Sequence, residues 1–346
     1  MKAMILAAGV GSRLDPLTRN VPKPMVPIVN RPVIEHIIDK LKKHGFDEIM
    51  VNLHYLGDII KDHLGDGSKL GVKLAYALED QLWGDAGSVK RSEEFLKGDT
   101  FIVVGGDDIS DINLTELLQF HKAKKAVSTL ALSLVDDPSE YGIVLTDDDG
   151  RITKFLEKPK GQVVFSNTAN TGVYVFEPEV FDIIPTGASF GFGHNVFPRL
   201  LEEDKPMYGY ITSAYWKDVG NLQVYRKTNF DALTGVVALN MGGDANTSGV
   251  RIGSNPSIDA TAEISGPSLI GDNVTIGAGS KILPNSIIGN NVKIGANATV
   301  SNSILWDNAQ VNDGTLLERT IIGRDATVQT NYGVFDGVVV NPNRGS

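Results

Sequence analysis

Residues 268–300 read SLIGDNVTIGAGSKILPNSIIGNNVKIGANATV, and an aliphatic residue returns at every sixth position. The same spacing runs without a gap from Ile252 to Val300, and Trp306 continues it. Glycine and asparagine gather between the aliphatic positions, so each hexad predicts one short strand followed by a turn. Stacked hexads bury a continuous aliphatic core, because each coil covers the next. The repeat therefore predicts a parallel β-helix.

Upstream of the repeat, the pattern predicts strands that alternate with helices. Apolar, β-rich runs predict strands at 3–7, 48–53, 72–77, 101–104, 128–134 and 173–176, and helical spacing marks 33–44 and 114–121. This alternation is typical of an α/β domain with a mostly parallel, Rossmann-like sheet. We expect this domain at 1–233, a linker at 234–248, the β-helix at 249–335 and a tail at 336–346, with 341–346 disordered.

The composition excludes several classes of protein. The 346 residues include no cysteine, which removes disulfides, thiolate metal sites and a cysteine nucleophile. A formal net charge of -10, with no run of lysine and arginine, argues against binding to nucleic acid or to an anionic membrane. The apolar start at 3–8 predicts a buried strand, since it is too short for a membrane helix and lacks a signal-peptide pattern. We expect a cytoplasmic protein.

The first predicted strand runs into a glycine loop. Ligands of open α/β sheets bind beyond the carboxyl ends of the strands, and this strand ends in LAAGVGSRL at 6–14. Gly9 and Gly11 allow backbone N–H groups to approach a phosphate. Leu14 breaks the dinucleotide pattern G-x-G-x-x-G, and no P-loop lysine follows. Prolines on both sides of Lys23 stiffen its segment, although that tripeptide alone would indicate only a surface lysine.

The whole run from Leu6 to Pro32 resembles the segment L-A-A-G-x-G-[ST]-R-L-x-P-L-T-x-x-x-P-K-P-[LM]-V-P of nucleotidyltransferases that activate sugar phosphates. The resemblance implies that an NTP and a sugar 1-phosphate react to give an NDP-sugar and pyrophosphate. It assigns nucleotide binding to Leu6, Ala7, Ala8, Gly9, Gly11, Ser12 and Arg13, with the triphosphate held by the loop from Gly9 to Arg13. Arg13 would hold the pyrophosphate leaving group, and Lys23 would stabilise charge at the reacting phosphate. Such chemistry needs positioned cations rather than a covalent nucleophile.

Two acidic segments supply the expected metal ligands. They read GGDDISD at 105–111 and WKDVGN at 216–221, and they resemble the family's G-D-x-[LI]-x-D and W-x-D-[VI]-G-[TN]. By this resemblance Asp107 and Asp218 bind one metal ion, and two carboxylates with phosphate oxygens suit Mg²⁺. Taken alone, Asp218 could also be an acid at a helix start. We expect Asp108 and Asp111 to be solvated turn residues.

Further segments resemble the sugar side of the same family. The run FLEKP at 155–159 matches F-x-E-K-P, in which Glu157 would bind sugar hydroxyls and Lys158 the sugar phosphate. Neighbours in a strand point to opposite faces, so a bulge or a strand end must bring both to the ligand. The resemblance also brings Gly142 close to the sugar and has Asn170 and Thr171 hydrogen-bonding its hydroxyls. Where the family reads D-F-x-K-D-x-F-P, this chain reads GFGHNVFP at 191–198, which leaves the sugar open.

The run EDQLWGDAG at 79–87 resembles the base-contacting E-x-x-P-L-G-T-A-G, with Asp85 in place of threonine. We therefore expect Glu79, Gly84, Asp85 and Gly87 to bind the nucleotide. A carboxylate can accept from guanine N1–H and its amino group together, which favours GTP. Mannose-1-phosphate guanylyltransferases commonly carry a left-handed β-helix of hexapeptide repeats, so mannose 1-phosphate is the favoured sugar. UTP or dTTP with glucose 1-phosphate is the alternative.

Two other functions were weighed for this architecture. Related hexapeptide proteins transfer acyl groups with a catalytic histidine, but all six histidines precede the repeat. Some relatives are non-catalytic regulatory subunits, whereas this chain retains Arg13, Lys23, Asp107, Lys158 and Asp218. The open ends of a β-helix need caps or partners, so we expect homo-oligomers that form through it.

Overall fold

The computed structural model describes residues 1–159, 164–242 and 244–341. Its helices are α1 (Val33–Lys43), α2 (Gly57–Leu64), α3 (Asp85–Arg91), α4 (Glu93–Leu96), α5 (Leu114–Lys124), α6 (Phe197–Glu202) and α7 (Leu222–Leu233). None of the helices within these ranges is long and apolar enough to cross a membrane. Residues 342–346, which were expected to be disordered, lie outside the described residues.

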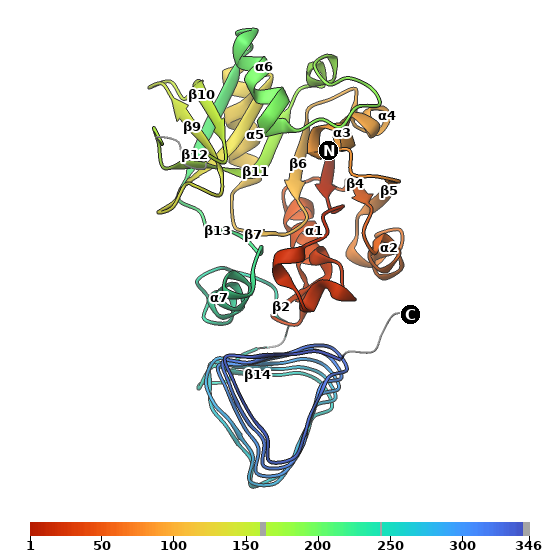
Figure 1. Cartoon of the computed structure of the whole chain (residues 1–346), viewed down its shortest axis with the longest axis vertical. Helices are drawn as coiled ribbons and strands as arrows, with labels where there is room; N and C mark the ends of the chain where they lie inside the picture. Colours follow the sequence, from red (N-terminus) through yellow and green to blue (C-terminus); the bar gives the residue numbers. More distant parts are fainter. Residues whose placement is uncertain (160–163, 243, 342–346) are drawn as a thin grey trace. The chain divides into compact units, whose positions relative to one another are not determined.

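A nine-stranded sheet forms the centre of the first part of the chain (Figure 1). Its strands are β1 (Lys2–Leu6), β4 (Glu48–Leu53), β5 (Lys73–Leu78), β6 (Phe101–Gly105), β8 (Ser128–Leu134), β9 (Gly142–Thr146), β10 (Ile152–Glu157), β11 (Thr168–Phe176) and β12 (Met207–Thr212). The order is β10-β9-β11-β6-β1-β4-β5, with β8 beside β11 and β12 beside β8. The strands predicted from the sequence are confirmed, and β11 starts earlier than expected.

Strands β6, β1, β4 and β5 are parallel to one another, whereas β11 is antiparallel to β6, β8 and β9. Runs such as Phe101–Val104 are buried throughout, as expected for strands that are covered on both faces. The carboxyl ends of the four parallel strands meet at one edge of the sheet. The loops in which the sequence predicts ligand or metal binding follow three of these ends, those of β1, β5 and β6.

Two short ribbons complete this part of the fold. Strands β7 (Asp108–Ser110) and β13 (Trp216–Asp218) pair antiparallel, with Asp218 opposite Asp108. Strands β2 (Pro27–Ile28) and β3 (Arg31–Pro32) form a hairpin whose turn residues, Val29 and Asn30, both have positive φ. The turn therefore has the mirror-image geometry that suits tight hairpins.

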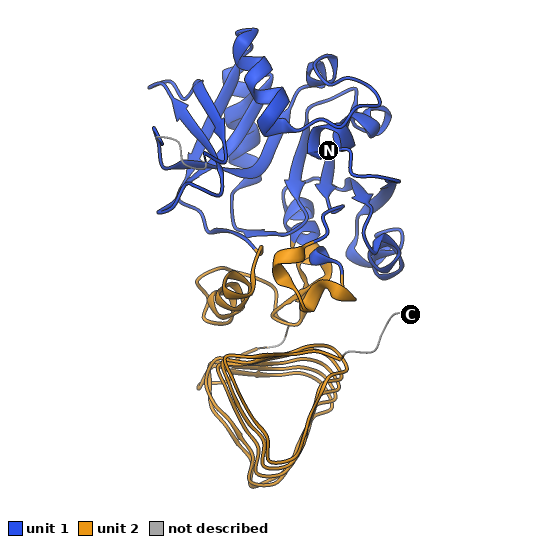
Figure 2. Ribbon diagram, in the orientation of Figure 1, with its two compact units in different colours: residues 1–10, 22–24, 37–218 blue, residues 11–21, 25–36, 219–346 orange. Residues whose placement is uncertain are grey.

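The chain divides into two compact units (Figure 2). Unit 1 contains residues 1–10, 22–24 and 37–218, and unit 2 contains residues 11–21, 25–36 and 219–346. Unit 2 thus joins α7, the β2–β3 hairpin and part of the glycine loop to the C-terminal repeat. The domain bounds expected from the sequence remain a prediction.

The repeat forms a parallel β-helix with three sides, and its coils are triangular in Figure 1. The first side consists of β14 (Val250–Ile252), β17 (Ser268–Ile270), β20 (Ser286–Ile288), β23 (Ile304–Leu305), β26 (Ile321–Ile322) and β29 (Val338–Val339). The second consists of β15 (Ser257–Ile258), β18 (Thr275–Ile276), β21 (Lys293–Ile294), β24 (Gln310–Val311) and β27 (Thr327–Val328). The third consists of β16 (Glu263–Ile264), β19 (Lys281–Ile282), β22 (Thr299–Ser301), β25 (Leu316–Glu318) and β28 (Gly333–Phe335). The predicted aliphatic positions fill its core.

The prediction that Trp306 occupies the aliphatic frame is wrong. Ile282 pairs with Val300, eighteen residues on, but Ile288 pairs with Leu305, seventeen residues on. The corner after Val300 is one residue shorter than the previous one, so Leu305 enters the core. Trp306 is instead buried outside that core, where its Nε1 donates to Tyr225 Oη of α7 at 2.8 Å.

The first side of the β-helix also has a buried outer face. Each of its inner strands carries a second aliphatic residue that must point away from the core, because neighbours in a strand alternate. These residues are nevertheless buried: Leu269, Ile287, Ile304 and Ile321. On the same side Asn30 Nδ2 of the hairpin donates to Ile288 O at 2.7 Å. Two adjacent aliphatic residues in every third hexad are the sequence pattern that could have predicted this packing face.

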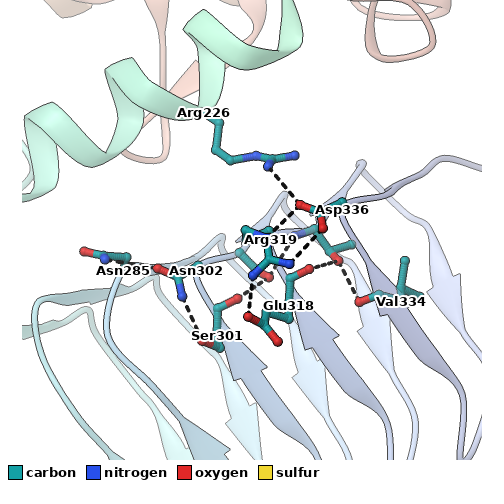
Figure 3. A network of polar contacts seen from close by, with 10 residues as sticks. Arg226, Asn285, Ser301, Asn302, Glu318, Arg319, Val334 and Asp336 are labelled. Atoms are coloured by element: carbon teal, nitrogen blue, oxygen red, sulfur yellow. Dashed lines mark hydrogen bonds and ion pairs between the residues drawn. The ribbon is translucent and has the colours of Figure 1, made fainter.

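An ion-pair network joins α7 to the last coil of the β-helix (Figure 3). The Asp336 carboxylate accepts two hydrogen bonds from the Arg319 guanidinium, at 2.7 and 2.8 Å, and lies 3.9 Å from Arg226 Nη1 of α7. Arg319 also pairs with Glu318. These contacts and the Trp306–Tyr225 bond hold α7 against the repeat within unit 2.

Candidate functional site

The acidic residues predicted from two distant segments come together in unit 1. Asp107 follows β6, and Asp218 ends β13, which pairs with the β7 ribbon beginning at Asp108. Oxygen atoms of these three carboxylates lie within 4.8 Å of one another. The ammonium of Lys23 contacts Asp107 and lies 2.8 Å from Asp218 Oδ1. The Lys23 side chain is 10% exposed, and those of Asp107 and Asp218 are 31% and 28% exposed.

Burial and the charges of the neighbouring groups together shift the pKa values of this cluster, in which one ammonium faces three carboxylates. Burial alone would lower the pKa of Lys23, but the charges of Asp107 and Asp218 raise it. Burial raises the pKa of Asp107 in spite of Lys23, and the charge of Asp218 raises it further. The pKa of Asp108 lies well above its usual value because of burial and then the charges of Asp107 and Asp218. The group therefore favours an additional cation.

The expectation that Asp108 is a solvated turn residue is wrong, because β7 turns it into this group. A side chain at Gly105 would place a Cβ 2.6 Å from Asp108 Oδ2, so glycine makes room for the carboxylate. Lys40 of α1 donates to Ser110 Oγ in the same ribbon at 2.5 Å. Asp111 is exposed as expected, and it accepts from Tyr215 N. Asp218 does not cap α7, since Asn221 performs that role.

On the other side of β1, a hydrogen-bonded chain fixes Glu79. Asn52, at the end of β4, accepts from Ala7 N at 2.7 Å and donates to Glu79 Oε1 at 3.0 Å. Glu79 is 7% exposed, and its other oxygen, Oε2, is buried and has no hydrogen-bond partner in the described residues. A buried acceptor left without a partner is costly, so this oxygen is ready for a donor from a ligand. The sequence analysis missed Asn52, a polar residue near the end of a buried strand.

The glycine loop continues from β1. Leu6 ends the strand, Ala7 and Ala8 are buried, and Gly9 is exposed. Gly11 has φ of 71°, a conformation that favours glycine, and its carbonyl accepts from Thr18 Oγ1 at 2.9 Å. Ser12 and Arg13 follow in a short 3₁₀ turn and are exposed. Gly9, Ser12 and Arg13 are thus among the exposed residues of the loop.

The sugar-side residues lie where strands end in unit 1. Glu157 is the last residue of β10, and Lys158, with φ of 43°, leaves the strand so that its Nζ lies 3.9 Å from Glu157 Oε1. The strand end, rather than a bulge at these residues, brings the two charges together. A Cβ at Gly142 would lie 2.8 Å from Glu157 Oε2. Asn170 donates to Tyr174 Oη and accepts from Gly172 N.

Thr171 does not fit its predicted role. It is 1% exposed, and its hydroxyl donates to Ala131 O of β8 at 2.8 Å. Because β11 pairs with β8 on that side, the side chain fastens two strands and its only proton is used. The expected hydrogen bond from Thr171 to a sugar hydroxyl is therefore corrected to a structural one.

The two places where the chain departs from the family pattern, Asp85 and the segment 191–198, contact each other. Asp85 begins α3, and its Oδ1 accepts from Phe192 N at 2.7 Å. Gly84, whose Cβ would lie 2.4 Å from Phe190 O, and Gly87, whose N donates to Phe190 O, line the same contact. The structure therefore places the Asp85 carboxylate on the 190–192 backbone, where it holds the GFGHNVFP segment.

Comparisons with known proteins identify the family of the chain. Residues 2–235 match the family model described as nucleotidyl transferase, and residues 248–344 match that of the EIF2B subunit epsilon LbH domain, a left-handed β-helix. The chain belongs to the nucleotidyl transferase family. The C-terminal repeat is accordingly a left-handed parallel β-helix.

Several named proteins resemble this nucleotidyltransferase. A UTP–glucose-1-phosphate uridylyltransferase of Synechocystis is 36% identical over 354 residues, which cover 96% of this chain and 90% of that protein. Mannose-1-phosphate guanylyltransferase 1 of Arabidopsis thaliana is 33% identical over 357 residues, which cover 98% and 96%. A crystal structure assigned as a glucose-1-phosphate thymidylyltransferase of Bacillus anthracis, in complex with sucrose, has a TM-score of 0.62 and 28% identity, covering 69% of this chain and 97% of that one.

Nucleotidyltransferases of this family use a divalent metal ion, and the acidic cluster fits one. Carboxylate oxygens from Asp107, Asp108 and Asp218 are hard ligands, and together with Lys23 they leave a formal charge of -2, from three negative charges and one positive. Burial first, and then the neighbouring carboxylates, raise the pKa values of Asp107 and Asp108, so added positive charge here would favour their ionised forms. A divalent cation would supply it.

Proposed function

We propose that this nucleotidyltransferase condenses an NTP with a sugar 1-phosphate to release pyrophosphate, with GTP and mannose 1-phosphate as its substrates. The observation that carries the proposal is the convergence of Lys23, Asp107 and Asp218 from segments more than 80 residues apart in the chain. A positioned ammonium beside carboxylates is the arrangement that phosphoryl and nucleotidyl transfer requires. A non-catalytic subunit would not need to maintain this group.

In this proposal Lys23 stabilises negative charge at the reacting phosphate, and its raised pKa keeps it protonated at neutral pH. Asp107 and Asp218 hold Mg²⁺, with Asp108 as a third carboxylate in reach. The ion would neutralise charge on the phosphates during transfer. The Gly9–Arg13 loop binds the triphosphate, and Arg13 receives the pyrophosphate. No residue of the chain needs to act as a covalent nucleophile, because the sugar phosphate carries an ionised oxygen.

The choice of GTP rests on Glu79. Its buried Oε2 is an acceptor without a partner, and Asn52 holds the carboxylate in place through Oε1. Guanine offers two donors, N1–H and an amino group, on one edge. Uracil and thymine offer one N–H between two carbonyl oxygens, and these oxygens would repel a carboxylate. Gly84 and Gly87 line the same loop and are proposed to lie beside the base.

The sugar phosphate is proposed to bind at Gly142, Glu157, Lys158 and Asn170. Lys158 is exposed and positive, which suits a phosphate, and the neighbouring Glu157 carboxylate suits sugar hydroxyls. The guanylyltransferase relatives support mannose 1-phosphate as the sugar phosphate. UTP with glucose 1-phosphate is the second candidate, because the similar cyanobacterial protein covers nearly the whole chain and is named for that reaction.

The test is pyrophosphate release by the full chain with GTP, UTP or dTTP, each paired with mannose 1-phosphate or glucose 1-phosphate. We expect the GTP and mannose 1-phosphate pair to be fastest, with activity that a chelator abolishes and Mg²⁺ restores. Lys23→Met and Asp107→Asn are each expected to lower turnover at least about a hundredfold. Lys42→Met, at an exposed lysine, is the control. Near-normal turnover of Lys23→Met, or no release with any pair, would refute the assignment.

We also propose that the β-helix mediates self-association. Its last two coils expose Leu316, Tyr332 and Phe335, and strand β28 ends its sheet with an unpaired edge in the described residues. Exposed apolar side chains beside an open edge suit a second copy of the chain. Light scattering of the full chain is the measurement, and a monomer at micromolar concentration would contradict this proposal.

A further inference from the structure

A glycine stands immediately before a helical turn on the sugar side of unit 1. The turn Phe192–Val196 leads into α6, and Gly191, in extended conformation, occupies the capping position before its first residue. The first N–H groups of a helical turn have no partner within the turn, and the residue at this position commonly supplies an acceptor from its side chain. Gly191 has no side chain that could do so.

Asp85 supplies the acceptor instead, from 107 residues before Phe192 in the chain. Its Oδ1 accepts from Phe192 N at 2.7 Å and from the neighbouring Ala86 N at 2.8 Å. A Cβ at Gly191 would lie 3.6 Å from Asp85 Oδ1, in ordinary van der Waals contact. The oxygen of Asp85 therefore lies beside the place that a larger side chain at 191 would occupy.

Two differences between this chain and the family pattern compensate each other. The pattern D-F-x-K-D-x-F-P has an aspartate where this chain has Gly191, and E-x-x-P-L-G-T-A-G has a threonine where it has Asp85. A carboxylate is thus absent from one position and present at the other, and both positions adjoin Phe192 N. The cap of the turn has moved from the turn itself to the loop at 84–87.

The capped turn is the surface against which Glu157 packs. A Cβ at Gly193 would overlap Glu157 Oε2, so the carboxylate lies directly on the backbone of the turn. The buried ring of Phe192 stacks on Phe197 with centroids 5.7 Å apart, and Phe197 packs on Phe155 of β10 at 5.0 Å. A shift of the turn would therefore shift Glu157, the residue proposed to bind sugar hydroxyls.

We propose that Asp85 is a positioning residue for the sugar phosphate, because it caps the turn Phe192–Val196 and so fixes the Glu157 carboxylate. This inference rests on the proposed function and adds to its sugar side a residue from the base-side loop. Two further backbone bonds, Gly87 N to Phe190 O and Phe190 N to Trp83 O, hold that loop without the Asp85 carboxylate. Loss of the cap should therefore weaken binding of the sugar phosphate rather than binding of the NTP.

The experiment is a double-mutant cycle on the full chain. Asp85→Thr introduces the residue of the family pattern, whose hydroxyl is one bond shorter and falls short of Phe192 N. Gly191→Asp introduces the other family residue at an extended position that accepts it, and supplies a carboxylate next to the turn. Asp99→Thr is the matched control, because exposed Asp99 accepts from its neighbour Thr100 N and from no distant segment in the described residues.

Steady-state kinetics of pyrophosphate release, with the substrate pair that the wild type uses best, measures both KM values. Asp85→Thr is expected to raise the KM for the sugar phosphate at least about tenfold and to leave the KM for the NTP within about twofold. Gly191→Asp alone is expected to raise the sugar-phosphate KM as well, because it places a second carboxylate beside Asp85. The double variant, with one carboxylate again, is expected to return to within about threefold of the wild type.

Hydrogen exchange of the Phe192 amide tests the cap without any turnover. This amide is expected to exchange at least about tenfold faster in Asp85→Thr than in the wild type, and to be protected again in the double variant. Asp85→Asn keeps an oxygen that can accept from Phe192 N, so it is expected to retain most of the protection and most of the affinity for the sugar phosphate. Asp99→Thr is expected to change neither measurement.

Three results would overturn the proposal while the wild type is active and the proposed function stands. They are an unchanged exchange rate of the Phe192 amide in Asp85→Thr, an equal rise of both KM values in that variant, and a double variant no better than Asp85→Thr. A wild type that releases pyrophosphate with no substrate pair would instead refute the proposed function, and this proposal with it.

Discussion

Replacing Asp108 with asparagine is expected to make the metal-free protein more stable and the enzyme slower. The substitution keeps the size of the side chain, so the space provided by Gly105 stays filled. It removes one of three carboxylates whose oxygens lie within 4.8 Å of one another. Because the cluster is a metal site in our proposal, stability and activity should change in opposite directions.

The magnitude follows from the geometry. Two unit charges 4.8 Å apart repel by about 3 kcal/mol at an effective dielectric constant of about 20. Asp108 meets two such neighbours, Asp107 and Asp218, and attraction to Lys23 and Lys40 offsets much of the repulsion. Solvent reaches the group and screens it further. We expect the free energy of unfolding without metal to rise by about 1–3 kcal/mol.

The pH dependence gives a second reading of the same effect. The folded-state pKa of Asp108 is raised above its usual 3.8, so the folded protein holds this proton to higher pH than the unfolded chain does. Its contribution to stability is therefore present at low pH and is lost as pH rises through the raised pKa. The metal-free wild type is expected to lose this stability toward neutral pH, and Asp108→Asn is expected to lose less.

The assay is urea unfolding of the full chain in a chelator and again with Mg²⁺, together with pyrophosphate release. Asp108→Asn is expected to gain less stability from Mg²⁺ than the wild type and to turn over at least about tenfold more slowly. Asp111→Asn is the control, because it removes a nearby exposed charge and keeps the oxygen that accepts from Tyr215 N. Lower stability of Asp108→Asn in chelator, or an unchanged response to Mg²⁺, would refute the reasoning.

Three further predictions concern other parts of the chain. Glu79→Gln keeps one acceptor but presents N–H donors to guanine, so the KM for GTP is expected to rise about tenfold and the KM for UTP to stay within about twofold. Steady-state kinetics measures both, and an unchanged preference for GTP would exclude Glu79 from base recognition. Trp306→Phe removes the hydrogen bond to Tyr225 and is expected to lower the unfolding free energy of the full chain by about 2–3 kcal/mol in urea, and a loss under about 0.5 kcal/mol would contradict it. Burial lowers the pKa of His121 below 6.5, so folding favours its neutral form and stability falls as pH drops below about 6.5. His121→Gln is expected to flatten this fall, measured as melting temperature against pH, and a pH profile identical to the wild type would contradict the prediction.

The amino-acid sequence alone predicted the fold class and the reaction chemistry. The fold class rests on local patterns, and the reaction chemistry rests on a family resemblance that short local motifs carry. A six-residue period defines a β-helix because every coil repeats the same short-range contacts, and alternating periods of two and 3.6 residues define an α/β sheet. The glycine loop and Lys23 lie within one short run, so their association needs no knowledge of distant contacts. The strands and the aliphatic core followed these expectations closely.

Only the tertiary structure decided which side chains meet across long stretches of chain. Asp108 joined the acidic cluster because β7 pairs with β13, about 110 residues away, and Asn52 reached Glu79 because β4 lies between β1 and β5. Thr171 donates to Ala131 O because β11 pairs with β8, which is again a contact between strands distant in sequence. A one-residue shortening of a corner moved Trp306 out of the β-helix core and onto α7. Periodicity fixes what a residue does within its own element, whereas its partners depend on how elements far apart in sequence pack, and no local pattern encodes that packing.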